Sequence, residues 1–493
     1  MICVSIGRGR HKHVIAEHKH LVERGAQLVE LRLDYINGTV NLKRLIGDRP
    51  CPVVITCRRE KDGGKWSGSE EERLTLLRSA IAEGVEYVDL EEDIAGNIPR
   101  FGKTKRIVSY HDFGATPDNL EALHSRMASL DADVVKIACM GHSTADNLRC
   151  LNLMRCSDVP TVAICMGEIG TPSRILAARF GAPFTYATFH HERSLAPGQL
   201  SFDQMQSIYH YDQVNEQTEI YGVLADPIGH SLSPIIHKSA FRQSGLNKLY
   251  VPFRVPREDL DTFLEGCREM GVAGLSVTIP HKEAVIRRLA QVDGAVKGIG
   301  AANTIVFGEG GGNGYNTDYR AAMDCLDGAT GGTGEKPLSG KNALVLGAGG
   351  VAKAVVFGLV RRGAKVTIAS RTRERAEGLA DRMGCTAVNW EQRHDVDAHI
   401  LINGTPLGMH PNVDQTPYDK RRIISTMVVF DTVYNPESTL LIKDAKAAGA
   451  KVVTGVEMFV RQAAYQFKLF TGQEAPLQLM RDTLKRATGA AKY

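Results

Sequence analysis

Closely spaced cysteine pairs are missing from this sequence. Its 493 residues include ten cysteines, but none forms a Cys-x-x-Cys pair, and the narrowest spacings are Cys51 to Cys57 and Cys150 to Cys156. These spacings fit neither a zinc knuckle nor a dithiol redox motif. We therefore expect reduced thiols, as in proteins of the cytosol, and no resident metal.

The sequence also lacks a long apolar segment and a strong charge of one sign. The N-terminal stretch is not apolar enough for a signal peptide, and the longest apolar run, 343–360, is broken by Lys353. The formal net charge of +4 is too small to indicate a nucleic-acid or acidic membrane partner. We expect a cytoplasmic monomer or homodimer that acts on small molecules, with no nucleic acid and no membrane as partner.

Short apolar, β-branched runs recur through the first part of the chain. They alternate with amphipathic stretches such as 68–84 and 119–131, which is the order of parallel βαβ units. The runs lie at 2–6, 28–34, 52–57, 87–91, 106–112, 134–139, 161–166 and 184–189. Eight strand-helix units predict a closed (β/α)8 barrel, which we place at 1–213.

Polar side chains occur near the C-terminal ends of these runs, where barrels of this type build their active sites. They are Glu30, Arg32, Asp34, Arg58, Glu91, His111, Asp112 and Lys136. Any one of them is better explained as a paired structural charge. Their convergence on one end of the barrel predicts a functional site.

Lys136 is the most informative of these residues. It lies inside the apolar run VVKIAC (134–139), where burial favours the neutral amine, a nucleophile toward carbonyl groups. His111, on the adjacent strand, can move protons near neutral pH. The two residues predict imine formation followed by dehydration or aldol chemistry. The alternative is a structural ion pair between Lys136 and a carboxylate such as Glu91.

Seven segments, in this order, resemble type I 3-dehydroquinate dehydratase. They are ELRLD (30–34), ITCR (55–58), VDLE (88–91), SYHDF (109–113), VKIA (135–138), SR (173–174) and APGQ (196–199). The resemblance implies that Lys136 forms an imine with 3-dehydroquinate, that His111 moves the protons and that Asp62 assists His111. It also implies substrate contacts from Glu30, Arg32, Arg58, Arg174 and Gln199.

The sequence departs from that family at two positions. The family usually has Glu before the Gly-Gly that follows the arginine of the third strand, whereas this chain has Asp62. The family tends to have Ser before APGQ, whereas this chain has Leu195 and loses a hydroxyl from the closing loop. These departures leave open the alternative that this half is a non-catalytic binding module.

A dinucleotide-binding motif marks the second part of the chain. An apolar strand at 343–346 is followed by GAGGVA (347–352) and a helical stretch, which is the G-x-G-x-x-A form of the fingerprint. The next strand, 365–370, is followed by Arg371 and lacks the terminal acid that would bind the ribose hydroxyl of NAD. Because arginine suits a 2′-phosphate, we expect NADP as the cofactor.

Polar clusters precede that motif. Ser231 and Ser233 flank the start of a helix, where one of them could simply be a cap. Thr278 and Lys282 follow a strand, and Asn303 and Asp318 lie further along. Lys282 and Asp318 can serve as proton donor and partner in the reduction of a carbonyl group. Alternatively they form a surface ion pair.

These clusters, with NGTPLGM (403–409), DTVYNP (431–436) and GVEMFVRQAA (455–464), resemble shikimate dehydrogenase over about 219–493. The resemblance implies a catalytic pair, Lys282 and Asp318. It implies substrate contacts from Ser231, Ser233, Thr278, Asn303, Tyr434 and Gln462. It implies NADP contacts from Gly347, Ala348, Gly349, Gly350, Val351, Ser370, Arg371, Thr372, Arg375, Thr405 and Gly455.

The second half is thus expected to be a two-lobed α/β dehydrogenase. We place a substrate lobe at 219–326, completed by helices in 461–493, and an NADP-binding Rossmann domain at 327–460. The glycine-rich tract 326–341 is expected to be a flexible hinge. The histidines of 11–20 could bind a metal, but a solvated first helix is the better interpretation.

The two resemblances imply consecutive reactions. Dehydration of 3-dehydroquinate gives 3-dehydroshikimate, and its reduction by NADPH gives shikimate. The whole chain resembles the bifunctional dehydroquinate dehydratase/shikimate dehydrogenase family. An alternative is that the second half acts mainly on quinate.

Overall fold

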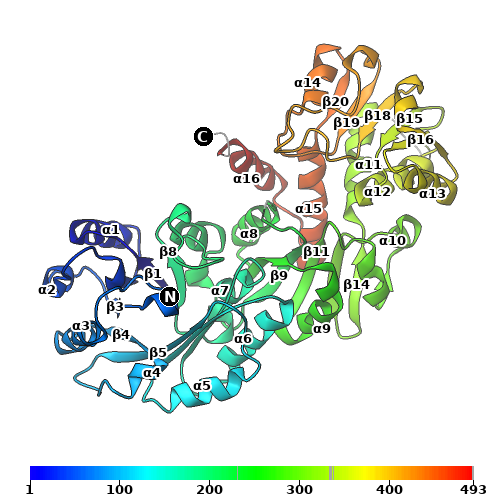
Figure 1. The fold of residues 1–493 in the computed structure, drawn as a ribbon. Helices are drawn as coiled ribbons and strands as arrows, with labels where there is room; N and C mark the ends of the chain where they lie inside the picture. Colours follow the sequence, from blue (N-terminus) through cyan, green and yellow to red (C-terminus); the bar gives the residue numbers. More distant parts are fainter. Residues whose placement is uncertain (230, 332–335, 337, 491–493) are drawn as a thin grey trace. The chain divides into compact units, whose positions relative to one another are not determined.

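The computed structural model describes residues 1–229, 231–331, 336 and 338–490 (Figure 1). The chain forms two compact units, of which unit 1 contains Met1–Ile220 and Asn247–Gly271 and unit 2 contains Tyr221–Leu246 and Val272–Tyr493. The sequence-based domain limits stay a prediction.

Eight parallel strands form the centre of unit 1, which confirms the predicted (β/α)8 barrel. Their hydrogen-bonded order is β7-β6-β5-β4-β3-β2-β1-β8. The strands are β1 (Ile2–Ile6), β2 (Leu28–Arg32), β3 (Val53–Thr56), β4 (Tyr87–Glu91), β5 (Lys105–Asp112), β6 (Val134–Met140), β7 (Thr161–Met166) and β8 (Thr185–Thr188). Each strand lies within or close to one of the eight predicted runs.

Helices alternate with these strands, as the sequence predicts. They are α1 (His11–Glu23), α2 (Leu42–Ile46), α3 (Glu70–Ala82), α4 (Glu92–Ala95), α5 (Leu120–Ala128), α6 (Thr144–Cys156) and α7 (Thr171–Ile175). Local sequence fixes where some of them begin. Ser69 caps α3 and Ser143 caps α6, each in a capping box with an acid three residues later, which satisfies backbone N–H groups of the first turn.

Inward-facing side chains recur at every second position of a strand, so they stack in layers inside the barrel. One apolar cluster contains Cys3, Leu28, Val54, Ile107, Val134 and Phe184. Two residues further along the same strands lie Ser5, Glu30, Thr56, Ser109, Lys136 and Tyr186, all buried. The polar residues of the barrel therefore rest on a packed apolar floor.

The histidines of α1 form the predicted solvated face only in part, since His20 is exposed whereas His18 is not. His18 is buried, and its Nε2 lies 3.2 Å from Cys51 Sγ. The Nε2 of His11 accepts the backbone N–H of Asn41 at 2.8 Å. His11 and His18 thus contact residues outside α1, which itself packs on α2. Among the described residues, no group of three or more His, Cys, Asp or Glu side chains is arranged to hold a metal.

The first lobe of unit 2 is a mixed sheet in which β9 (Glu219–Ala225), β11 (Val272–Val277), β13 (Thr304–Gly308), β14 (Gly311–Tyr315) and β12 (Gln291–Val292) follow one another. Its helices include α8 (Ser233–Gln243), α10 (Gly294–Ile299) and α11 (Thr317–Thr330). The intervening β10 (Lys248–Arg254) and α9 (Leu260–Met270) belong to unit 1, where α9 packs on α6.

The second lobe of unit 2 confirms the predicted Rossmann fold. Six parallel strands lie in the order β17-β16-β15-β18-β19-β20. The strands are β15 (Asn342–Leu346), β16 (Lys365–Ser370), β17 (Thr386–Asn389), β18 (Ile400–Asn403), β19 (Val428–Asp431) and β20 (Lys451–Val453). Its helices include α12 (Gly350–Arg361), α13 (Arg373–Met383) and α14 (Leu440–Ala447). Two further helices, α15 (Gly455–Thr471) and α16 (Leu477–Ala490), pack on α8 of the first lobe, and α15 also contacts β11 and β13.

The predicted flexible hinge at 326–341 is wrong for its first residues. Residues 326–330 continue α11, because Leu326 is buried in the core that α11 shares with α12. The helix ends at Gly331, whose φ of 68° is the left-handed conformation that glycine adopts readily. Residues 332–335 and 337 of the predicted hinge lie outside the described residues.

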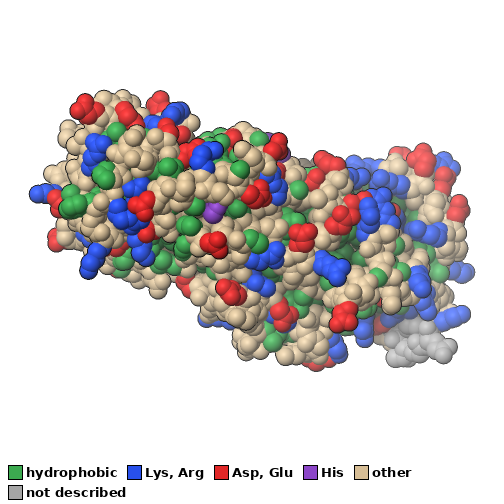
Figure 2. All heavy atoms as spheres, turned by 90° about the horizontal axis from the view of Figure 1, so that it is seen from below, with side chains coloured by type: hydrophobic (Ala, Val, Ile, Leu, Met, Phe, Trp, Pro, Cys, Tyr) green, Lys and Arg blue, Asp and Glu red, His purple; other side chains and the backbone are tan. Residues whose placement is uncertain are grey.

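Acidic and basic side chains lie interspersed over most of the face drawn in Figure 2. Among the described residues, no helix combines the length and the apolar character needed to cross a membrane.

Candidate active sites

A cavity of about 60 Å³ lies at the C-terminal ends of the barrel strands. Of the polar residues predicted at the strand ends, Asp34, Glu91 and Asp112 do not line it, but it brings together every residue that the resemblance implies for the first site. These are Glu30, Arg32, Arg58, Asp62, His111, Lys136, Arg174 and Gln199. Further lining residues, among them Ser5, Phe113 and Tyr186, were missed by the sequence analysis.

Lys136 is ion-paired inside this cavity. Its Nζ lies 3.0 Å from Asp89 Oδ2 and 3.7 Å from Glu30 Oε1. The alternative partner considered from the sequence, Glu91, instead lies 2.8 Å from Arg73 of α3. Asp89 was missed as an individual residue, although it stands in the VDLE segment. The available signal was an acidic residue inside one apolar strand, Asp89, which could neutralise the lysine inside another.

Arg58 connects that carboxylate to the histidine. Its Nη2 lies 2.8 Å from Asp89 Oδ1, and its Nη1 lies 2.8 Å from His111 Nε2. Burial disfavours the charged carboxylate, but Arg58 and Lys136 outweigh it and lower the pKa of Asp89. Burial, followed by the charges of Arg58 and Lys136, holds the pKa of His111 well below its usual range. His111 is therefore a neutral imidazole that can accept a proton.

Asp62 has a different partner from the one implied by the resemblance. Its Oδ2 accepts a hydrogen bond from Arg59 Nε at 2.6 Å, and its side chain lines the cavity. Among the described residues, no hydrogen bond joins Asp62 to His111.

Arg174 is a buried cation at the cavity wall. Its Nη2 donates to the backbone oxygen of Pro197 at 3.2 Å, and its Nε has no hydrogen-bond partner among the described residues. No carboxylate in the described part of the chain pairs with it, and burial lowers its pKa to about 10. The loop beside it is braced by Gln199, whose Oε1 accepts the backbone N–H of Leu195 at 2.9 Å.

Two other predicted residues are held by neighbours. Glu30 accepts hydrogen bonds from Ser5 Oγ at 2.6 Å and Thr56 Oγ1 at 2.8 Å. Arg32 makes a two-pronged pair with Asp34, at 2.9 and 2.8 Å. These bonds fix both side chains at the cavity before any ligand binds.

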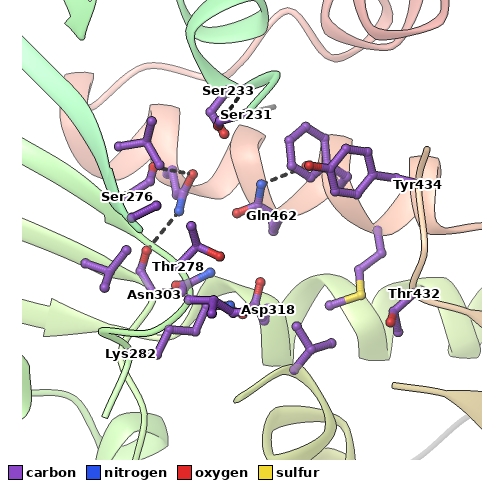
Figure 3. A pocket seen from close by; sticks show the side chains of 18 of the residues that line it. Ser231, Ser233, Ser276, Thr278, Lys282, Asn303, Asp318, Thr432, Tyr434 and Gln462 are labelled. Carbon is purple, nitrogen blue, oxygen red and sulfur yellow. Dashed lines mark hydrogen bonds and ion pairs between the residues drawn. The ribbon is translucent and has the colours of Figure 1, made fainter. Parts of the chain in front are cut away.

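A second cavity, of about 360 Å³, lies between the two lobes of unit 2 (Figure 3). Its wall includes Ser231, Ser233, Thr278, Lys282, Asn303, Asp318, Val351, Tyr434, Gly455 and Gln462, all predicted from the sequence. Figure 3 shows the two serines on one side and Lys282 with Asp318 on the other. Ser276, Thr432 and Gln466 also line it and were not predicted.

Lys282 and Asp318 form a close pair at this cavity. Lys282 Nζ lies 2.6 Å from Asp318 Oδ2, and their side chains are only 12% and 7% exposed. The alternative of a surface ion pair is therefore wrong. A Cβ at Gly350, in the first turn of α12, would lie 3.0 Å from Lys282 Cδ, so the glycine leaves room for the lysine.

A hydrogen-bond network behind the cavity orients Asn303. Gln466 of α15 accepts from Ser276 Oγ at 2.8 Å and donates to the backbone oxygen of Asn303 at 3.1 Å. The Asn303 amide donates to Thr317 Oγ1 at 2.9 Å and accepts the Thr317 backbone N–H at 2.8 Å. One amide hydrogen of Asn303 is left for a ligand.

The glycine-rich turn after β15 has the shape that a dinucleotide needs. Gly347 has a φ of 103°, and a Cβ there would lie 2.9 Å from the backbone oxygen of Gly404. Gly349 is the N-cap of α12, so the free N–H groups of that helix face the turn. Ala348 and Gly350 complete the turn, which can hold a pyrophosphate.

The segment after β16 carries free cationic side chains. Arg371 and Arg375 are exposed and have no ion pair among the described residues, whereas Arg373 Nε lies 2.6 Å from Glu377 Oε1. Ser370 Oγ accepts the backbone N–H of Thr372 at 3.3 Å. This arrangement offers two arginines to a phosphate at the end of β16.

Thr405 begins the loop after β18. Its Oγ1 donates to Asn403 Oδ1 at 2.7 Å and accepts the backbone N–H of Leu407 at 3.2 Å. Asn403 in turn donates to Asp431 Oδ1 at 2.9 Å. The loops that follow β18 and β19 are thus joined through buried polar groups.

Known family models match most of the chain. The type I 3-dehydroquinase model matches residues 2–216, and the shikimate dehydrogenase substrate binding domain model matches 223–305. The shikimate / quinate 5-dehydrogenase model matches 333–404, and the shikimate 5′-dehydrogenase C-terminal domain model matches 455–485.

Individual relatives agree with these matches. The chain is 37% identical to the chloroplastic bifunctional 3-dehydroquinate dehydratase/shikimate dehydrogenase of Arabidopsis thaliana, over 97% of this chain and 83% of that protein. It is 41% identical to the NADP⁺ shikimate dehydrogenase of Methanothermobacter thermautotrophicus, over 55% of this chain and 98% of that one. A crystal structure of a shikimate dehydrogenase in complex with NADP⁺ superimposes with a TM-score of 0.52 at 36% identity, covering 56% of this chain and 97% of that one.

Proposed function

Since the chain belongs to the bifunctional 3-dehydroquinate dehydratase/shikimate dehydrogenase family, we propose that it catalyses two successive reactions. The barrel dehydrates 3-dehydroquinate to 3-dehydroshikimate. Unit 2 reduces the ketone of 3-dehydroshikimate to shikimate with NADPH.

In the barrel, Lys136 is the nucleophile. Its amine adds to the ketone carbon of 3-dehydroquinate, and loss of water leaves an imine. His111, held neutral by burial and by Arg58, removes a proton from the carbon next to the imine carbon. The hydroxyl group one carbon further receives that proton from His111 and leaves as a second water molecule. Hydrolysis of the imine then releases the product and restores Lys136.

The observation that carries the dehydratase assignment is the unpaired cation at the cavity wall. A buried guanidinium without a carboxylate partner is costly unless a ligand supplies the anion. Arg174 has that environment and can bind both oxygens of the substrate carboxylate with its planar fork. Glu30 and Arg58 contact ring hydroxyl groups of the substrate in this proposal.

In unit 2, Lys282 and Asp318 provide the proton. Lys282 donates it to the ketone oxygen as that oxygen gains charge, and Asp318 at 2.6 Å holds the ammonium in position. NADPH supplies the hydride when it is bound. Ser231 and Ser233, on the other side of the cavity, would donate to the substrate carboxylate, and Thr278, Asn303, Tyr434 and Gln462 would surround the ring.

The residues of the Rossmann lobe fit NADP rather than NAD. Gly347 leaves space that a Cβ would fill, and the start of α12 offers backbone N–H groups to the pyrophosphate. Arg371 and Arg375 are free to pair with a 2′-phosphate. Val351, Thr405 and Gly455 would line the path toward the nicotinamide.

A coupled assay tests both activities in one chain. Purified protein is mixed with NADPH and either 3-dehydroquinate or 3-dehydroshikimate, and loss of the nicotinamide absorbance is followed. We expect oxidation with both substrates. Oxidation with 3-dehydroshikimate alone would leave the barrel as a non-catalytic module, and no oxidation with either would overturn the proposal. Parallel oxidation of shikimate and quinate compares the two substrates of the second site.

Two broader expectations remain proposals. The chain acts as a monomer or a homodimer, which light scattering of the purified protein measures. It resides in the cytoplasm, whereas the Arabidopsis relative is described as chloroplastic. A fluorescent fusion in the source cell distinguishes the two locations.

A further inference from the structure

Tyr186 forms part of the inner wall of the barrel cavity. It lies on β8, opposite Cys3 of β1, and only 3% of it is exposed. Its ring packs edge-on against Phe184, with centroids 5.7 Å apart, and thus stands on the apolar floor. Tyr186 lines the same cavity as Lys136 and Arg174.

The hydroxyl of Tyr186 is buried, and no described protein group lies within hydrogen-bond distance of it. Burying an unpaired hydroxyl costs free energy that a phenylalanine at this position would avoid. Burial and the nearby thiol and carboxylates raise the pKa of Tyr186 well above its usual value, so the group is a neutral hydrogen-bond donor. A donor of this kind in a ligand cavity calls for an acceptor on the ligand.

The ring of Tyr186 also contacts the predicted nucleophile. Lys136 Nζ lies 4.1 Å from the ring centroid, over its face. This cation–π contact adds to the ion pairs with Asp89 and Glu30 in holding the amine. The hydroxyl at the edge of the same ring is therefore close to whatever is bonded to the amine.

We propose that Tyr186 is a further substrate-binding residue of the dehydratase site. Its ring face positions the Lys136 amine, and its hydroxyl donates a hydrogen bond to the oxygen of the carbinolamine that precedes the imine, or to a hydroxyl group on the neighbouring ring carbon. The closing loop presents Leu195 and no hydroxyl at that position, so the barrel wall supplies one instead. This inference rests on the proposed dehydration of 3-dehydroquinate.

The test compares Tyr186→Phe with Tyr211→Phe in the full-length chain. Tyr211 is a buried tyrosine of the same unit that does not line the cavity, so it controls for loss of a buried hydroxyl. For Tyr186→Phe we expect kcat/KM of dehydration to fall about tenfold or more. Its melting temperature should not decrease, because an unpaired buried hydroxyl is removed. Reduction of 3-dehydroshikimate should be unchanged in both variants.

Borohydride treatment with saturating 3-dehydroquinate separates binding from loss of the nucleophile. Tyr186→Phe should still gain the substrate mass on Lys136. If the parent chain has no dehydratase activity, the proposed function itself is wrong, and the role of Tyr186 falls with it. If the parent is active and Tyr186→Phe stays within about twofold of it, the inference is wrong. A lower melting temperature with loss of both activities would show a structural role and would equally overturn it.

Discussion

Lys282 Nζ lies 2.6 Å from Asp318 Oδ2 at the wall of the larger cavity, and neither side chain is more than 12% exposed. Screening by water and salt is weak for such a pair, so its charges act strongly on a bound ketone. The two residues come from different segments, the turn after β11 and the first turn of α11. The two side chains therefore come together only when this lobe is folded.

Replacing the ammonium group should abolish the reduction and leave the dehydratase reaction intact. For Lys282→Met we expect kcat for 3-dehydroshikimate to fall about a hundredfold or more, because the proton donor is lost. Steady-state kinetics measures this, and dehydration of 3-dehydroquinate in the same chain should be unchanged. Lys468→Met is the control, since Lys468 forms an exposed ion pair with Glu474. A kcat for Lys282→Met close to that of the control would remove Lys282 from the mechanism.

Arg174 is expected to promote substrate binding while lowering the stability of the barrel. For Arg174→Met, kcat/KM of dehydration should fall about a hundredfold, because the charge-assisted bonds to the carboxylate are lost. The melting temperature should stay level or rise, since a buried cation without a carboxylate partner gives way to an apolar side chain. Arg174→Lys keeps the charge but not the fork and should be intermediate in activity. Unchanged kinetics in Arg174→Met would contradict the role.

Local patterns were sufficient to predict much of the architecture. The barrel strands are short apolar runs that alternate with helices. A strand that is buried on both faces has such a run whichever strands lie beside it, so it can be found from its own residues. Lys136 was identified because a lysine inside such a run is rare. The Rossmann turn was identified because its glycines are required by the backbone conformation of the turn itself, so the whole signal lies within a few consecutive residues.

Pairings between distant residues could not be predicted in the same way. Whether Lys136 meets Asp89 or Glu91 depends on which residues of β4 face the barrel interior beside β5 and β6. Gln466 reaches Ser276 only because α15 packs on β11. The orphan hydroxyl of Tyr186 is likewise visible only once its surroundings are known.

The preference for NADPH should depend on Arg371. For Arg371→Asp, we expect KM for NADPH to rise about tenfold or more, because an acid repels the 2′-phosphate. The ratio of the activity with NADH to the activity with NADPH should therefore increase. Initial rates with both cofactors measure this. Arg373→Ala is the matched control, since Arg373 is already paired with Glu377 on the surface. If both variants keep the parent preference, the phosphate is bound elsewhere.

Asp431 should make the stability of the dehydrogenase half depend on pH. Its carboxylate is fully buried and accepts hydrogen bonds from Thr439 Oγ1 at 2.6 Å and the Val433 N–H at 3.0 Å. Burial outweighs these bonds and raises the pKa of Asp431 from 3.8 to about 6. Between these values the folded chain keeps a proton that the unfolded chain releases. The stabilising contribution is therefore complete below the unfolded pKa and is lost as pH rises through the folded pKa.

The loss from this group amounts to about 3 kcal/mol at most. Asp431→Asn cannot ionise but keeps an acceptor oxygen for the Val433 N–H, so it should lack this dependence. Urea midpoints for loss of shikimate dehydrogenase activity, taken at about pH 5 and about pH 7.5, measure the difference. The parent chain should lose more stability between the two pH values than Asp431→Asn does. Equal losses would mean that the Asp431 carboxyl titrates alike in the folded and unfolded chains.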